Sequence, residues 1–103
     1  MSDQENLTSF ATLVNIMAKL RSPEGCPWDR EQTHASIMSN LIEECYEVME
    51  AFHQGDSQKF CEELGDLLMQ VVLHAQNGFE EGEFDMGKLL ESINSKLIRR
   101  HPH

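Results

Sequence analysis

The chain has 103 residues, and 18 acidic against 8 basic side chains give it a formal charge of −10. This length predicts one domain, residues 1–103, whose modest core would gain from self-association. Binding to a nucleic-acid polymer is excluded by the acidity, because Lys and Arg must neutralise phosphates, and no apolar run is long enough to span a membrane. The acidic N-terminus and three unpatterned cysteines favour a cytoplasmic protein without disulfides or zinc.

The first half of the chain predicts two amphipathic helices. Apolar residues recur at helical spacing from Leu7 to Leu20, and the turn at 22–25 ends this first helix. After a loop, the second helix begins behind Thr33, a predicted N-cap, and ends at Gly55, a favourable residue just after a helix.

The second half predicts two more helices. The third begins at Asp56 or Ser57 and runs to about residue 78, and the fourth follows Asp85 as its N-cap. In the fourth helix we expect four apolar side chains to face inward: Leu89, Leu90, Ile93 and Leu97. No segment alternates like a strand, so the chain is all-α, and the third helix is apolar over so much of its surface that it predicts a subunit interface.

Two pairs of carboxylates interrupt this apolar pattern. Glu44 and Glu47 form one pair with i, i+3 spacing, and Glu63 and Asp66 form the other, so each pair shares a helical face. In a tight hairpin around Gly55, Glu44 and Asp66 lie at one height and Glu47 and Glu63 at another. Four carboxylates this close need a cation, and hard oxygen ligands favour Mg²⁺ or Mn²⁺. The alternative is two ordinary solvated pairs.

Four sequence blocks occur in a specific order: LRSPEGCPWDREQTH at 20–34, EECYE at 43–47, ELGD at 63–66 and KLIRRHPH at 96–103. With these blocks the chain resembles the MazG-type nucleotide pyrophosphohydrolases over most of its length. The resemblance implies a four-helix bundle completed by homodimerisation or a larger assembly. It also implies Mg²⁺-dependent hydrolysis of nucleoside triphosphates between the α and β phosphates, which releases a monophosphate and pyrophosphate and removes aberrant nucleotides.

The resemblance also implies roles for individual residues. It makes the same four carboxylates the metal ligands, and Glu43 is the candidate that positions the attacking water. Four basic residues are implied to contact the triphosphate: Lys59, Lys96, Arg99 and Arg100. The alternatives are an i, i+4 ion pair with Glu63 for Lys59, and a preference of cations for a helix C-terminus for the others.

Further candidates lie around this site. Asn40, one turn before Glu44, is expected to contact the nucleotide, and Trp28 either stacks on its base or anchors the loop before the second helix. Glu50 is expected to be a solvated residue further round the second helix. The family pattern continues beyond His103, which predicts either a short single-domain member or a truncated chain.

Two rival functions remain open. The pairs Glu31/His34 and Glu50/His53 have the E-x-x-H spacing of di-iron bundles, although their predicted positions lie away from Glu44. A non-catalytic nucleotide-binding or regulatory module is the second rival.

Overall fold

The computed structural model describes residues 6–101, and all regular structure in this range is helical. In chain order the helices are α2 (Phe10–Leu20), α3 (Pro27–Glu31), α4 (His34–Gln54), α5 (Ser57–Glu80) and α6 (Met86–Arg100). The all-α prediction is therefore confirmed. No helix in the described part of the chain combines the length and apolarity needed to cross a bilayer.

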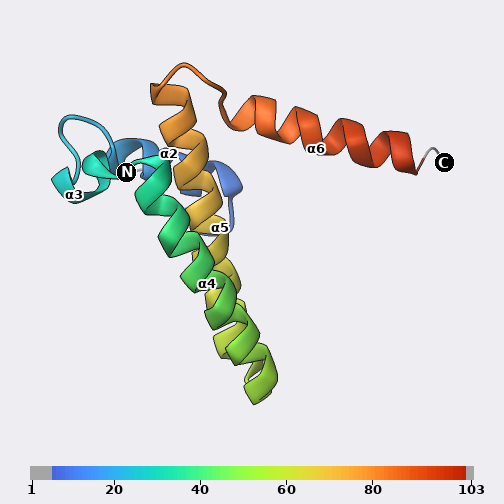
Figure 1. Cartoon of the computed structure of the whole chain (residues 1–103). Helices are drawn as coiled ribbons and strands as arrows, with labels where there is room; N and C mark the ends of the chain where they lie inside the picture. The colour runs from blue at the N-terminus through green and yellow to red at the C-terminus, as the bar shows by residue number, and fades with distance from the viewer. Residues whose placement is uncertain (1–5, 102–103) are drawn as a thin grey trace.

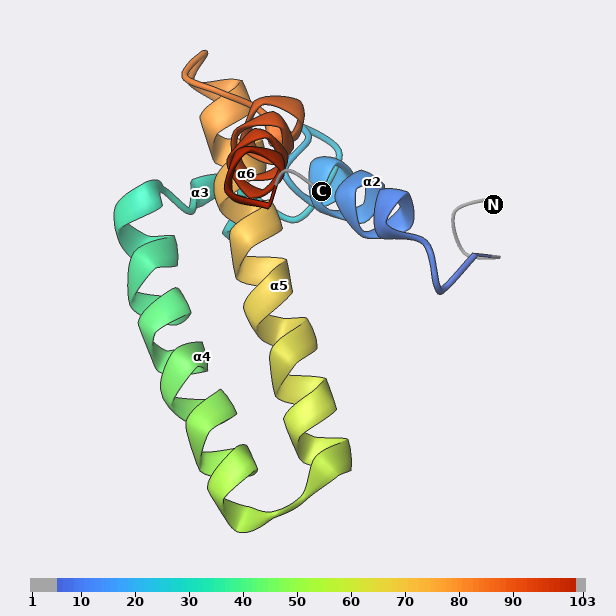
Figure 2. The ribbon, with the colours of Figure 1, turned by 90° about the vertical axis from the view of Figure 1, so that its right-hand side faces the viewer.

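The centre of the molecule is the antiparallel hairpin of α4 and α5 (Figure 2). Thr33 caps α4 as predicted, by a reciprocal pair of hydrogen bonds with Ser36. Gly55 ends α4 with a positive φ of 75°, which glycine adopts without steric cost. Asp56 then caps α5 by accepting a hydrogen bond from the Lys59 backbone N–H. This short turn fixes the register of the two helices.

The core is small and lies where α2 packs against α5, toward the open end of the hairpin. Four buried side chains make its centre: Met17 from α2, Ile37 from α4, and Val72 and Leu73 from α5. Ile37 is completely buried. Removing these apolar surfaces from water is the main contribution that holds α2 against the hairpin.

A buried arginine holds the segment between α2 and α4 against the end of α5. The Arg21 guanidinium donates through Nε and one Nη to the Glu80 carboxylate and through the other Nη to the Asp29 carbonyl oxygen at 2.6 Å. These bonds join the end of α2, the short helix α3 and the end of α5. The loop predicted here contains α3, which was missed because a five-residue helix shows no apolar period.

Two expectations about helix faces are wrong in the single chain. Leu7 precedes α2, which begins after Ser9 as N-cap, and its side chain is 83% exposed. Helix α6 projects away from the hairpin (Figure 1) and contacts only α5 among the helices. Of the four α6 side chains expected to face inward, Leu89 is half-buried, whereas Leu90, Ile93 and Leu97 are exposed because no other helix covers them.

Candidate active site

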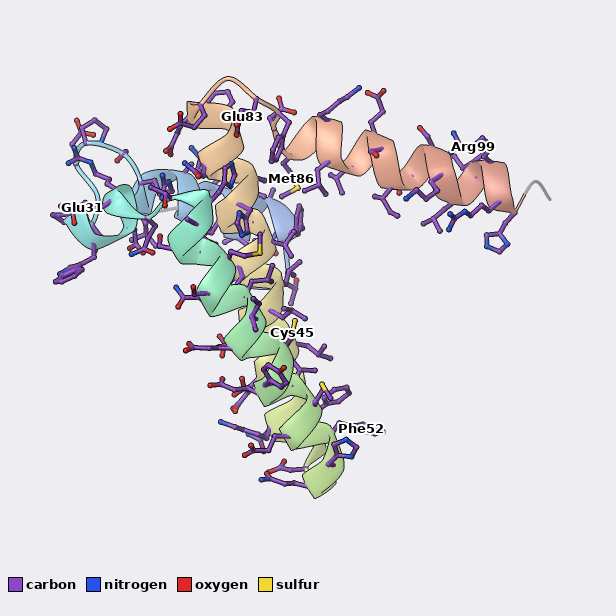
Figure 3. The ribbon with its side chains drawn as sticks, in the orientation of Figure 1. Glu31, Cys45, Phe52, Glu83, Met86 and Arg99 are labelled. Carbon is purple, nitrogen blue, oxygen red and sulfur yellow. The ribbon has the colours of Figure 1, made fainter. Side chains whose placement is uncertain are left out.

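The carboxylates of the two motifs meet across the hairpin. One oxygen each from Glu44, Glu63 and Asp66 lies within 4.8 Å of the other two, close enough to hold one metal ion. Glu47 lies beside this cluster, because it lines the same cavity as Glu63. Figure 3 shows oxygen-tipped side chains along one edge of the hairpin and the labelled Cys45 and Phe52 along the other. The structure thus brings three of the four predicted residues together, and Glu47 lines a cavity with Glu63 beside them.

Lys59 brings a positive charge to this cluster. Its Nζ lies 3.1 Å from Glu63 Oε1, so the i, i+4 ion pair that was the alternative to phosphate contact forms. The hydrogen bond from Lys59 is the main cause that lowers the pKa of Glu63, and the same contact raises the pKa of Lys59. Glu63 is only 5% exposed, which by itself disfavours its charge, so the contact with Lys59 is what favours its ionised form.

The other two glutamates hold their protons more tightly. Burial is the main cause that raises the pKa of Glu44 to about 7, with further contributions from its hydrogen bond to Glu63 and from the neighbouring negative charges. The hydrogen bond and charge of Glu63 likewise raise the pKa of Glu47. In the chain without metal, protons thus relieve a repulsion that a cation would relieve.

The donor set fits a hard divalent cation. Glu44 Oε2 and Glu63 Oε2 are buried and have no hydrogen-bond partner among the described residues. All candidate ligand atoms are carboxylate oxygens, which Mg²⁺ and Mn²⁺ prefer, and neither sulfur nor imidazole belongs to the group.

A polar cavity of about 310 Å³ adjoins the cluster on the side of the turn. Its lining includes Glu47, Lys59 and Glu63, and also Glu50 and Gln54. Glu50 was expected to be an ordinary solvated residue, and although it is exposed, it borders the site. Its i, i+3 spacing from Glu47 was the sequence signal that could have found it.

The remaining candidates differ in where they lie. Asn40, one helical turn before Glu44, and Glu43, directly before it, are both exposed on α4. Trp28 is 76% exposed, so it does not anchor the loop in the single chain. The structure does not bring the three basic residues of α6 to the carboxylates; these are Lys96, Arg99 and Arg100. The helix leaves the hairpin, and Figure 3 shows Arg99 at its far end.

His34, from one of the two E-x-x-H pairs, contacts another histidine and a glutamate and is not part of the carboxylate cluster. His34 Nδ1 lies 2.9 Å from His74 Nδ1, and His34 Nε2 lies 2.9 Å from a Glu83 oxygen. Because an ionised carboxylate only accepts, His34 donates from Nε2 to Glu83 and accepts at Nδ1 from His74. Within residues 6–101, the group of Glu44, Glu63 and Asp66 is the one set of three or more ligands at metal-binding distance.

A comparison with known protein families shows the family of this chain. The model of the MazG nucleotide pyrophosphohydrolase domain matches residues 32–103, which include the whole hairpin and both carboxylate pairs. The chain belongs to the MazG family. The resemblance inferred from the four sequence blocks is thereby confirmed, and α2 and α3 precede the matched region.

Several curated relatives are similar to this chain over most of its length. The nucleoside triphosphate pyrophosphohydrolase/pyrophosphatase MazG of Thermotoga maritima is 56% identical over 94 residues, which are 91% of this chain and 37% of that protein. The nucleoside triphosphate pyrophosphohydrolase of Escherichia coli K12 is 52% identical over 92 residues, 88% of this chain and 35% of that protein. The uncharacterized protein YabN of Bacillus subtilis is 50% identical over 94 residues, which are 19% of its length. The chain thus spans about a third or less of these relatives.

Proposed function

We propose that this MazG-family chain is a nucleoside triphosphate pyrophosphohydrolase that removes unwanted nucleotides in the cytoplasm. It would hydrolyse the bond between the α and β phosphates and release a nucleoside monophosphate and pyrophosphate. The observation that carries the proposal is the meeting of Glu44, Glu63 and Asp66 beside Lys59, with two buried carboxylate oxygens that have no partner among the described residues. The names of the Thermotoga maritima and Escherichia coli relatives support it.

Four residues would hold the metal, which is Mg²⁺ or its substitute Mn²⁺: Glu44, Glu47, Glu63 and Asp66. When bound, the cation neutralises charge on the phosphate oxygens as water adds to the α-phosphorus. Binding it also requires Glu44 and Glu47 to give up the protons that the crowded cluster favours.

The remaining side chains would position the reactants. Glu43 accepts a proton from the attacking water and passes it to solvent, for which its exposed position is suitable. Lys59 donates hydrogen bonds to the β- and γ-phosphate oxygens. Its ammonium charge, which now pairs with Glu63, would then be shared between Glu63 and the phosphates. Trp28, which is largely exposed, offers a ring on which the base can stack.

A homodimer or higher homo-oligomer would complete the site. The hairpin edge opposite the carboxylates exposes large apolar side chains, and so does α6; they include Ile42, Met49, Leu64, Leu68, Ile93 and Leu97. Surfaces of this kind mark protein interfaces. Because α6 leaves its own hairpin, we assign its three basic residues to the phosphates bound at the site of a second copy.

The test is the release of pyrophosphate and monophosphate from a panel of nucleoside and deoxynucleoside triphosphates with Mg²⁺, Mn²⁺ or EDTA. Turnover should need the metal, be lost in Glu44→Gln, and persist in the matched control Glu62→Gln, which changes an exposed neighbour of the site. Mixing Glu44→Gln with Arg100→Ala chains should restore activity if the arginine acts on the second copy. Binding of triphosphates without turnover would instead support the regulatory module, and equal activity of Glu44→Gln and Glu62→Gln would refute the site.

A further inference from the structure

Two side-chain amides lie next to the carboxylate cluster of the hairpin. Asn40 on α4 and Gln70 on α5 are each 15 residues from Gly55, so they have the same height in the antiparallel pair. The register is fixed on both sides of this layer, by the carboxylate cluster on one side and by the contact of His34 with His74 on the other. Asn40 and Gln70 therefore lie one helical turn beyond Glu44 and Asp66, on the side away from Gly55.

Gln70 is a costly residue at this position. Its side chain is more than nine-tenths buried, with 7% of the residue exposed, and Oε1 is buried with no hydrogen-bond partner among the described residues. An unpaired amide destabilises a folded chain, whereas an apolar side chain of similar size would pack without this cost. A half-turn of the amide exchanges its oxygen and nitrogen, so the group can offer an acceptor or a donor to a ligand.

The distribution of charge along the hairpin determines which end of a bound nucleotide would lie toward the turn. Lys59 and the 310 Å³ cavity lie on the turn side of Glu44 and Asp66, where a cation meets the charged phosphates. Asn40 and Gln70 lie on the opposite side and carry no charge. One helical turn separates Asp66 from Gln70, about 6 Å along the axis, which is comparable to the span of the sugar carbons between the α-phosphate and the 3′-hydroxyl.

We propose that Gln70 and Asn40 bind the 3′-hydroxyl of the sugar of a nucleoside triphosphate whose phosphates point toward Lys59. The Gln70 oxygen accepts the hydroxyl hydrogen, and the Asn40 amide donates to the hydroxyl oxygen. This assignment rests on the proposed function, and it makes the sugar, not only the phosphates, a determinant of which substrates the enzyme accepts.

The test compares kcat/KM for 2′-deoxy and 2′,3′-dideoxy forms of the four standard nucleoside triphosphates. Wild type should prefer the deoxy form by about five- to tenfold, as expected for a hydroxyl that pairs with neutral groups. In Gln70→Leu this ratio should fall to about one, because activity toward the deoxy form drops while activity toward the dideoxy form is nearly kept. Gln58→Leu, the same change at an exposed position of α5, should keep the wild-type ratio.

The controls separate this assignment from a structural role. Gln70→Leu should melt no lower than wild type, and if it fails to fold, the exposed Asn40→Ala variant tests the same ratio. A wild-type ratio of one, or a ratio that both variants leave unchanged, overturns the assignment of the sugar while pyrophosphate release continues. Wild-type protein that hydrolyses no triphosphate overturns the proposed function, and this inference with it.

Discussion

Replacing Glu44 with Gln should stabilise the metal-free protein at alkaline pH while it abolishes hydrolysis. The pKa of Glu44 is raised from 4.5 to about 7, first by burial and then by its contacts with Glu63 and the other carboxylates. A pKa difference of one corresponds to about 1.4 kcal/mol, which sets an upper bound of about 3 kcal/mol on the cost of ionising Glu44 in the folded chain. Because the side chain is only half-buried, water screens these charges, and we expect about 1–2 kcal/mol.

The raised pKa also fixes the direction of the pH dependence. A group with a higher pKa in the folded chain than in the unfolded chain stabilises the fold fully below its unfolded value, and this contribution is lost as the pH rises through its folded value. The Glu44 contribution to wild-type stability should therefore disappear between pH 4.5 and about 7. The Gln variant has no such loss, so its advantage should appear over the same interval.

Urea denaturation and thermal melting, both followed by circular dichroism with EDTA and at one chain concentration, measure this difference at about pH 5 and about pH 8. At the higher pH the variant should melt roughly 5 °C or more above wild type, since 1 kcal/mol shifts the melting point of a domain this size by about 4–8 °C. Adding Mg²⁺ should stabilise wild type and leave Glu44→Gln almost unchanged. The reasoning is refuted if the variant is less stable than wild type at about pH 8, or if the difference is the same at both pH values; Glu62→Gln is the control.

Two further predictions concern the fold. Glu80→Gln should cost about 2–3 kcal/mol, because the buried Arg21 guanidinium loses its counter-charge. Since Arg21 lowers the pKa of Glu80, this penalty should be complete above pH 4.5 and vanish as acid protonates Glu80 in wild type, and a penalty that persists in acid would contradict the ion pair. Gly78→Ala places a methyl group 2.8 Å from the Phe84 ring and should cost about 1–3 kcal/mol in thermal unfolding. The cost should shrink in a Phe84→Ala background, and an equal cost in both backgrounds would argue against the contact.

The long helices and the carboxylate site were predictable because local signals determine them. Thr33, Gly55 and Asp85 mark helix ends through backbone hydrogen bonding and dihedral preference, which the sequence displays directly. The site follows from the same turn, since counting residues from Gly55 sets which carboxylates face each other. A site on two consecutive helices needs no knowledge of the rest of the fold.

The unpredicted features depend on contacts between distant segments. The position of α6 could not be derived, because its apolar face is indistinguishable in sequence from one that packs within the same chain. The Arg21–Glu80 ion pair joins residues 59 positions apart without any periodic signal. Gln70 follows Asp66 by four residues in the sequence, but only the structure shows that its side chain is buried and that Oε1 has no hydrogen-bond partner among the described residues.

The hairpin has a consequence for the order of folding. All four proposed metal ligands lie between positions 44 and 66, so a single short loop closes when they meet, and short loops close quickly at low entropic cost. The carboxylates can therefore gather before α6 finds any surface to cover, and during synthesis they leave the ribosome well ahead of it. Cation binding by the proposed ligands would then favour the hairpin early, and α6, which contacts only α5 among the described helices, would take its place after the hairpin has formed.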